Sequence, residues 1–185
     1  MKGDVILMFT CKRIICLVWT VLLTFGFVIS AQAQTYQAYV EKRVSQIRAE
    51  VNAINKDAAK YKKTTKNVED ISLEGTDATF FHSAKDLKKI TAQMFGETYN
   101  ATSEFYYENG KLIFAFVKRN QYDTQIGVNP PPKVVSTEER RFYFRSDDEL
   151  IRLLVGKKEL KPVGENYSQL KNEIINISSK LKDSY

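Results

Sequence analysis

Cysteine is nearly absent from this chain of 185 residues, which contains only Cys11 and Cys16. Both precede residue 34, so the remainder can form no disulfide bond, thiolate nucleophile or cysteine-ligated metal site. Histidine occurs once, as His82, and the eight glycines are scattered, so the sequence has no glycine-rich phosphate loop. Without covalent or metal cross-links, the chain from residue 34 onward has to fold on its hydrophobic core.

The sequence also contains no pattern that rises to a catalytic signature. A Ser-His-Asp arrangement would have to use His82, and the surrounding Phe80-Phe81-His82-Ser83 predicts an exposed histidine beside a turn. The densest acidic cluster, Asp147-Asp148-Glu149, lacks the alternating spacing of a calcium loop. Four further carboxylates are predicted on strands: Glu104, Glu108, Glu138 and Glu139. Nothing in the sequence selects two of them as a pair, so we expect no catalytic residue, metal or cofactor.

The first 33 residues have the pattern of an export signal. Basic residues 12–13 precede an uncharged apolar run from Ile14 to Ile29, and Ala31-Gln32-Ala33 matches the small-x-small cleavage pattern. The run is shorter than the roughly 20 residues of a spanning helix, although a retained membrane anchor is the alternative. We therefore predict a signal peptide over residues 1–33 and a protein that is periplasmic or secreted, with no membrane span after cleavage.

Charge gives little indication of a partner. The predicted signal holds three basic residues and one acidic residue out of 28 and 22, which leaves a net charge of about +4 after cleavage. This charge is mild and evenly spread, so it predicts no nucleic-acid binding. The longest basic cluster, Lys60-Tyr61-Lys62-Lys63, falls where the first helix is expected to end. Met8 would begin a more typical signal than Met1, and the sequence allows either start.

Two amphipathic segments predict helices at the ends of the exported region. The first runs from Tyr36 to about Lys62, and the second from Glu165 to Leu181. Each has one apolar stripe with spacings of three and four: Val40, Val44, Ile47, Val51 and Ile54, and then Tyr167, Leu170, Ile174, Ile177 and Leu181. Because each stripe spans barely two heptads, packing onto a sheet is favoured over a coiled coil.

Between the helices, three similar segments predict β-hairpins: Thr79 to Phe95, Phe105 to Phe116 and Arg141 to Leu154. Each has an aromatic cluster, a polar turn and then a leucine. We therefore predict an α+β fold with an antiparallel β-meander of about six strands, flanked by N- and C-terminal helices. The predicted boundaries are 34–66 for the first helix, 67–160 for the meander and 161–185 for the last helix, with 34–185 forming a single domain.

The central hairpin has the clearest turn signal. Asn109-Gly110 suits the two positive-φ positions of a two-residue turn. This turn predicts four cross-strand pairs: Glu108 with Lys111, Tyr107 with Leu112, Tyr106 with Ile113, and Phe105 with Phe114. Opposite-charge and aromatic–aliphatic pairs of this kind stabilise a sheet.

The outgoing strand of that hairpin is apolar on both faces. The prediction places Leu112, Phe114 and Phe116 on one face and the intervening Ile113, Ala115 and Val117 on the other, so both faces need a cover. We expect the helices to cover one face. For the other we expect a folded-back flap formed by Asn120 to Ser136, whose prolines exclude a central strand. A binding loop is the alternative interpretation of this segment.

Aromatic and basic residues on neighbouring strands predict a possible contact surface: Tyr106, Tyr143, Arg141, Arg145 and Lys118. An aromatic sheet face edged by cations can stack on sugars, bases or acidic peptides. The alternative is that these aromatics form the core and cross-strand pairs, because strands are enriched in Tyr and Phe.

The segment Tyr106-Tyr107-Glu108-Asn109-Gly110-Lys111-Leu112 resembles the tandem β-hairpin repeats of MORN-variant proteins. It is also similar to exported, uncharacterised bacterial proteins with such hairpins between two helices. The resemblance implies an open antiparallel sheet used for scaffolding or protein contact. We therefore expect a non-catalytic module that binds another protein or an envelope component. The alternatives are a hydrolase that uses strand carboxylates around a Tyr/Arg face, and a small-ligand carrier with a pocket between sheet and helices.

Overall fold

The structure is a computed structural model that describes residues 34–146 and 148–185. Residues 34–57 are helical and are followed by the short 3₁₀ turn η1 (Ala58–Lys60). The chain ends in the helix α2 (Glu165–Asp183). The strands are β1 (Lys62–Val68), β2 (Thr76–Ser83), β3 (Asp86–Gly96), β4 (Tyr99–Glu108), β5 (Lys111–Tyr122), β6 (Val134–Ser146), β7 (Glu149–Val155) and β8 (Lys158–Leu160). The predicted signal peptide lies outside the described residues.

Contacts divide the chain into two units, Met1–Lys42 and Arg43–Tyr185. In the first unit, the described residues 34–42 are helical, and Gln37 Nε2 donates a hydrogen bond to Glu41 Oε1 at 3.1 Å. The second unit contains the remaining helical residues 43–57, the whole sheet and α2.

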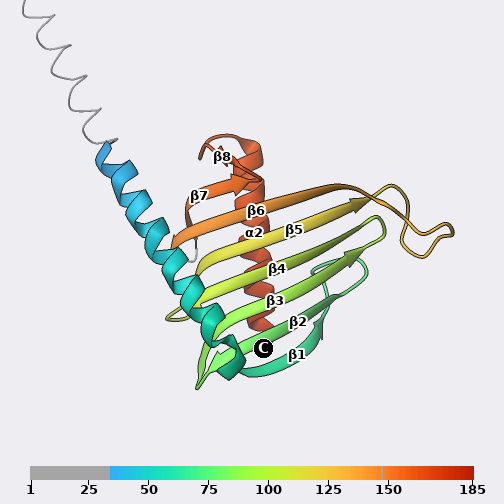
Figure 1. The fold of residues 1–185 in the computed structure, drawn as a ribbon, viewed down its shortest axis with the longest axis horizontal. Helices are drawn as coiled ribbons and strands as arrows, with labels where there is room; N and C mark the ends of the chain where they lie inside the picture. The colour runs from blue at the N-terminus through green and yellow to red at the C-terminus, as the bar shows by residue number, and fades with distance from the viewer. Residues whose placement is uncertain (1–33, 147) are drawn as a thin grey trace, which may run out of the picture. The chain divides into compact units, whose positions relative to one another are not determined.

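All the strands form one antiparallel sheet in which each strand pairs with its neighbours in sequence (Figure 1). The predicted α+β class, with an antiparallel sheet and helices at both ends, is confirmed. The predicted count of about six strands is wrong, because the sheet has eight. The three predicted hairpins are β2–β3, β4–β5 and β6–β7. The two additional strands, β1 and β8, lie at the edges.

The predicted end of the first helix is also wrong. Helical residues end at 57, and Lys62 and Lys63 already belong to β1. The sequence of β1, KKTTKNV, has only one apolar residue, so it lacks the alternation by which strands are recognised. An edge strand tolerates this composition, since lysines on a sheet edge discourage pairing with other chains.

The central turn forms as predicted, but the pairing beyond it is shifted. Asn109 and Gly110 have φ values of 53° and 76°, as a two-residue hairpin turn requires. Glu108 pairs with Lys111 as expected. A bulge then places the extra residue Ile113 in β5, so Tyr106 pairs with Phe114. The bulge reverses the predicted face of every residue that follows it, because side chains alternate along a strand.

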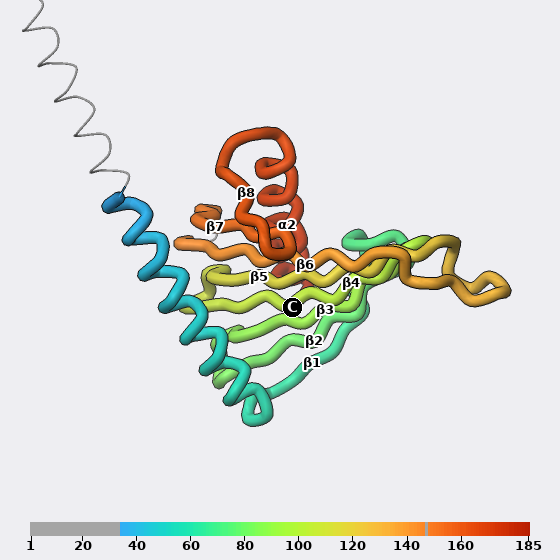
Figure 2. The backbone as a smooth tube through the Cα atoms, turned by 45° about the horizontal axis from the view of Figure 1, so that its top comes forward, coloured from blue at the N-terminus to red at the C-terminus, as the bar shows by residue number. Residues whose placement is uncertain are grey.

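The two helical segments cover opposite faces of the sheet, as Figure 2 shows for α2 and residues 43–57. Side chains of α2 pack on the larger core, in which Phe105 and Phe142 are almost completely buried. Burial of an aromatic side chain of this size contributes about 2 kcal/mol. The α2 members of this core are Tyr167, Leu170, Ile174 and Leu181. Because each face has a helical cover, the apolar strand β5 needs no third layer.

The segment from Asn120 to Ser136 is therefore not a folded-back flap. Strand β5 continues to Tyr122 and β6 begins at Val134, and the connection between them projects beyond the sheet (Figures 1 and 2). We call residues 120–136 the arm. Its Asn129–Pro130 peptide bond is cis.

Candidate binding face of the sheet

A row of seven side chains crosses the sheet on the face that residues 43–57 cover. Cross-strand pairing places one from each strand, β1 to β7, side by side: Lys63, Phe81, Lys89, Tyr106, Phe114, Tyr143 and Arg152. The last five of these are buried. Ring centroids are 5.7 Å apart between Tyr106 and Phe114, and 4.9 Å apart between Phe114 and Tyr143, as favourable aromatic pairs require. This row is the helix-facing core of the sheet.

Basic side chains of the helix bind the same region. Arg48 Cζ lies 5.6 Å from the centroid of the Tyr143 ring, and its Nε donates to Tyr143 Oη at 3.4 Å. Five residues earlier in the helix, Arg43 Nη2 is 3.1 Å from Glu108 Oε2. Cation–ring contacts of this kind are stabilising where water is excluded. They hold residues 43–57 against the sheet.

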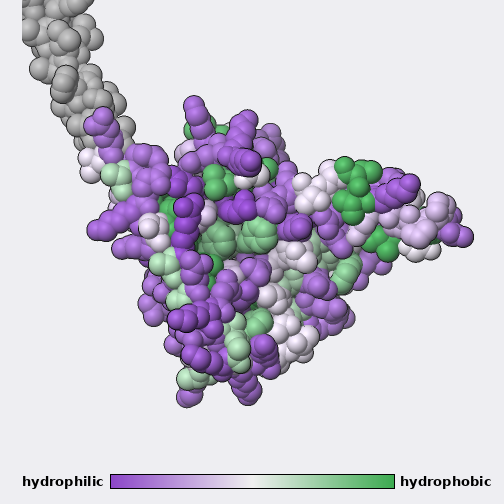
Figure 3. All heavy atoms as spheres, in the orientation of Figure 1, coloured by the Kyte–Doolittle hydropathy of each residue, from purple (hydrophilic) through white to green (hydrophobic). Residues whose placement is uncertain are grey.

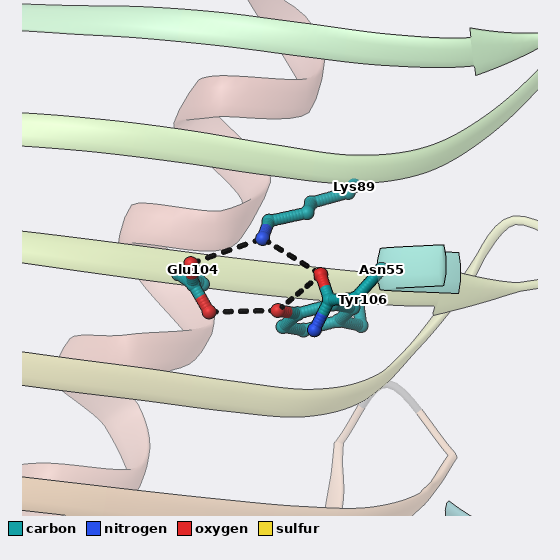
Figure 4. A network of polar contacts seen from close by, with 4 residues as sticks. All are labelled: Asn55, Lys89, Glu104 and Tyr106. Carbon is teal, nitrogen blue, oxygen red and sulfur yellow. Dashed lines mark hydrogen bonds and ion pairs between the residues drawn. The ribbon is translucent and has the colours of Figure 1, made fainter. Parts of the chain in front are cut away.

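A network of four polar groups lies where the end of the helix meets the sheet (Figure 4). Lys89 Nζ donates to Glu104 Oε1 and to Asn55 Oδ1, both at 3.0 Å. Tyr106 Oη lies 2.7 Å from Glu104 Oε2 and 3.0 Å from Asn55 Oδ1. A phenol has one proton, and the carboxylate is the closer and stronger acceptor, so Tyr106 donates to Glu104.

The network affects the protonation of its phenol. Burial, and then the hydrogen bond and negative charge of Glu104, raise the pKa of the Tyr106 phenol well above its ordinary value. The Lys89 ammonium also lies 4.8 Å from the centre of the Tyr106 ring. Because Glu104 binds both Lys89 and Tyr106, neither offers an unengaged nucleophile. The network instead connects the helix to strands β3 and β4.

Two further rows on the same face lie progressively farther from the helix contacts. The first contains Thr65, Thr79, Thr91, Glu104, Phe116, Arg141 and Leu154, and the second contains Asn67, Asp77, Gln93, Thr102, Lys118 and Glu139. The first row is mostly half-buried, and the second is exposed except for its half-buried glutamate. Burial therefore falls row by row away from the helix. We call these two rows the open face.

The predicted contact residues fall into three groups. Tyr106 and Tyr143 are 0% and 3% exposed, so they lie inside the sheet–helix contact and not on the surface. Arg141 and Lys118 lie on the open face. Arg145 lies beside the β6–β7 turn, where its Nε is 2.6 Å from Glu149 Oε2.

The two cations of the open face are held differently. Arg141 Nη2 donates to Glu139 Oε2 at 2.6 Å, and its Cζ lies 5.4 Å from the centre of the Phe116 ring. Lys118 is exposed and forms no ion pair within the described part of the chain. The open face thus presents one ion-paired cation and one exposed cation on adjacent strands.

Sequence reasoning missed the polar members of the open face on β1 to β4. Their signal is the alternation in β2, where Asp77 and Thr79 are interleaved with the buried Ala78 and Phe80. Alternation of this kind predicts a strand with one uncovered face. The neighbouring threonines bond across strands, and Thr65 Oγ1 and Thr79 Oγ1 are 3.0 Å apart.

Each predicted strand carboxylate has its own cationic partner. Glu104 binds Lys89 and Glu108 binds Arg43. The other two pairs are Glu138 with Arg140 and Glu139 with Arg141. Because Glu138 and Glu139 are consecutive in β6, they lie on opposite faces of the sheet. The four carboxylates therefore do not converge on one point.

His82 is buried, so its predicted exposed position is wrong. Its ring stacks on that of Tyr185, with centroids 4.1 Å apart and an angle of 24° between the planes. Burial and, second, the positive charge of Lys62 lower the pKa of His82. Among residues 34–146 and 148–185, its Nε2 has no hydrogen-bond partner. Lys66 Nζ donates to the carbonyl oxygen of Ser184 at 2.9 Å, which fastens this end of the chain to β1.

Several hollows lie beside α2. One, about 230 Å³, includes Leu112, Ser178 and Lys182 in its lining. Another, about 70 Å³, lies between the sheet and α2 and includes Met94, Phe142 and Leu170 in its lining. This volume is below the roughly 300 Å³ at which pockets for small molecules begin. A larger one, about 840 Å³, is formed by the β1–β2 loop, Tyr99 and Lys180, and its lining is about equally polar and apolar.

Within the described ranges, no group of three or more His, Cys, Asp or Glu residues is placed to hold a metal ion. No helix in this part of the chain has the length and apolar character needed to cross a membrane. Comparison of the chain with protein-family models, with curated proteins and with solved structures gives no match.

Proposed function

We propose that this protein is an exported, non-catalytic module that binds another macromolecule, a protein or a component of the bacterial envelope, across the open face. The observation that carries the proposal is the fall in burial from the row under the helix to the row that contains Thr102 and Lys118. A sheet face that is half covered and otherwise exposed leaves a continuous surface for a partner.

The size of this surface favours a macromolecule over a small ligand. The first row of the open face extends from β1 to β7, and strands lie about 4.8 Å apart, so it spans roughly 29 Å. Its hydroxyl, amide and charged groups suit a polar partner that is bound by many hydrogen bonds. The half-buried Phe116 and Arg141 would form the centre of such an interface, because aromatic and arginine side chains dominate binding energy.

Charge reversal and added bulk on the open face test the proposal. Lys118 and Thr102 are cross-strand neighbours with exposed side chains. Lys118→Glu combined with Thr102→Tyr should abolish co-purification of the partner with the tagged full chain from its native host. Lys157→Glu makes the same charge change at the exposed β7–β8 turn and should leave co-purification unchanged. Equal recovery of the partner with both variants would exclude the open face.

Export is the second part of the proposal. It is supported by the charge, apolar run and cleavage pattern of residues 1–33. N-terminal sequencing of the exported protein should begin at or near Gln34. An intact chain that remains bound to membrane would contradict it.

A further inference from the structure

Exposed aliphatic side chains are concentrated on the arm. The described residues include nine large hydrophobic side chains that are exposed, and four of them lie within ten residues of one another: Ile126, Val128, Val134 and Val135. Their exposed fractions are 41% to 61%. Figure 3 shows hydrophobic side chains gathered on the projecting arm. Scattered exposed apolar residues are ordinary, but a local group of this kind marks a contact surface.

The backbone of the arm is held in place. Asp123 N donates to Lys133 O at 3.0 Å, and Lys133 N donates to Asp123 Oδ1 at 2.8 Å. Ile126 N donates to the carbonyl oxygen of Glu97 at 2.7 Å, which connects the arm to the β3–β4 turn. These bonds anchor the arm at residues 123, 126 and 133, so binding would cost less ordering entropy than binding by an unanchored loop.

At the tip of the arm, residues 129–132, we expect side chains and not backbone groups to contact a partner. Pro130, Pro131 and Pro132 have no N–H group, so this segment cannot extend a sheet with a partner strand. Consecutive prolines flanked by aliphatic residues fit grooves lined by aromatic or aliphatic side chains. Strand β6 also has an extra residue, Val135, at a bulge where the arm leaves the sheet. Bulges re-aim the strand and are common beside functional sites.

The charges near the arm indicate which charged residues a groove on a partner protein would need at its rim. A hollow of about 310 Å³ separates the arm from the sheet end, and the carboxylates of Glu74 and Glu97 line it. Asp123 adds a third acid at the base of the arm, against two bases, Lys133 on the arm and Arg119, whose Cζ lies 3.9 Å from the centre of the Tyr99 ring. An anionic lipid surface would repel this excess of acidic groups, whereas basic residues at the rim of a groove on a protein would complement it.

We infer that residues 126–135 of the arm dock into an apolar groove, rimmed by Lys or Arg, on a second protein. The docking element is separate from the open face, so this inference and the proposed function can fail independently.

Cross-linking from the arm tests this inference in the full chain. A photoreactive amino acid at Val128 should cross-link one protein in the native host, and the adduct should map to an apolar groove flanked by Lys or Arg. The same group at Ala84, in the exposed β2–β3 turn, should not. With that protein purified, Val128→Thr and Val134→Thr together should weaken binding at least tenfold, because these exposed side chains keep their shape and lose only apolar surface.

Several results would overturn the inference. These are no adduct from Val128, adducts equal to those from Ala84, adducts only with a second copy of the chain, or unchanged affinity of the threonine variant. Flotation of the purified protein with vesicles of phosphatidylglycerol and phosphatidylethanolamine, abolished by the threonine substitutions, would instead assign the arm to a lipid surface.

Discussion

Lys89 and Glu104 form an ion pair, with 3.0 Å between Nζ and Oε1, in which the two partners are unequally buried. The lysine side chain is 9% exposed and the glutamate side chain is 38% exposed. Loss of the glutamate would leave a buried cation with only the Asn55 carbonyl as acceptor, whereas loss of the lysine would leave a carboxylate that water can reach. The two halves of the pair therefore have different effects on stability.

Glu104→Gln should lower the free energy of unfolding by about 2 kcal/mol, because it leaves the Lys89 charge without its counter-ion. Lys89→Met should lower it by only about 1 kcal/mol, since the exposed carboxylate regains hydration. The double variant should be more stable than Glu104→Gln alone. Urea unfolding of residues 34–185 measures all three. A larger loss for Lys89→Met than for Glu104→Gln would show that the pair is not organised in this way.

His82 makes stability depend on pH. Its pKa is lowered in the fold, so the unfolded chain binds the proton more readily. The stabilising contribution is therefore present above the unfolded value of about 6.5 and is lost as pH falls from there through the folded pKa. Two cations lie near this site: Lys62 on β1, and Lys66, whose Nζ lies 5.4 Å from the centre of the Tyr185 ring. Neither supplies a negative charge that would stabilise protonated His82. Urea unfolding across this range should show stability falling toward acid.

The matched control is His82→Phe, which keeps an aromatic ring against Tyr185 and removes the titrating group. Its stability should change less between about pH 7 and about pH 5 than that of the natural chain. Since the chain has a single histidine, the imidazole resonances in a proton NMR titration report this site alone. An imidazole pKa above 6.5 in the folded protein would be inconsistent with the buried position.

The turn at Gly110 gives a prediction based on backbone conformation alone. Its φ is 76°, and a Cβ built there meets nothing within 4 Å, so a side chain would be accommodated but its backbone would be strained. Gly110→Val should therefore lower the free energy of unfolding by at least about 1 kcal/mol. Gly110→Asn should cost clearly less, because asparagine tolerates positive φ. Equal melting temperatures for the two variants would mean that the turn does not constrain this residue.

Local signals in the sequence predict some parts of this fold and miss others. The Asn109-Gly110 turn depends on two adjacent residues, so it is predicted correctly. The bulge at Ile113 is not, because it depends on how Tyr106 and Phe114 pack under the helix. Strand β1 has few apolar residues and exists because β2 offers it a partner. Whether such an edge segment forms a strand depends on pairing with its neighbour and not on its composition.

The contact surface, too, could be predicted only in part from local signals in the sequence. Alternation separates Tyr106 from Tyr107, but it cannot say which face each helix covers. The structure places Tyr106 under residues 43–57 and Tyr107 in the core against α2, so both are buried. Lys118 and Arg141 could be recognised as surface cations from their strand positions. The exposed position of the polar residues on β1 to β4 could also have been predicted, from the alternation of polar and apolar residues in β2.

The most direct test of the open face is site-specific photo-crosslinking in the full chain. A photoreactive amino acid at Thr102, in the exposed row of the open face, is compared with one at Asn172, which is exposed on α2. The proposal predicts that Thr102 cross-links to the co-purifying macromolecule and that Asn172 does not. Adducts only from Asn172, or equal adducts from both positions, would contradict binding across the open face.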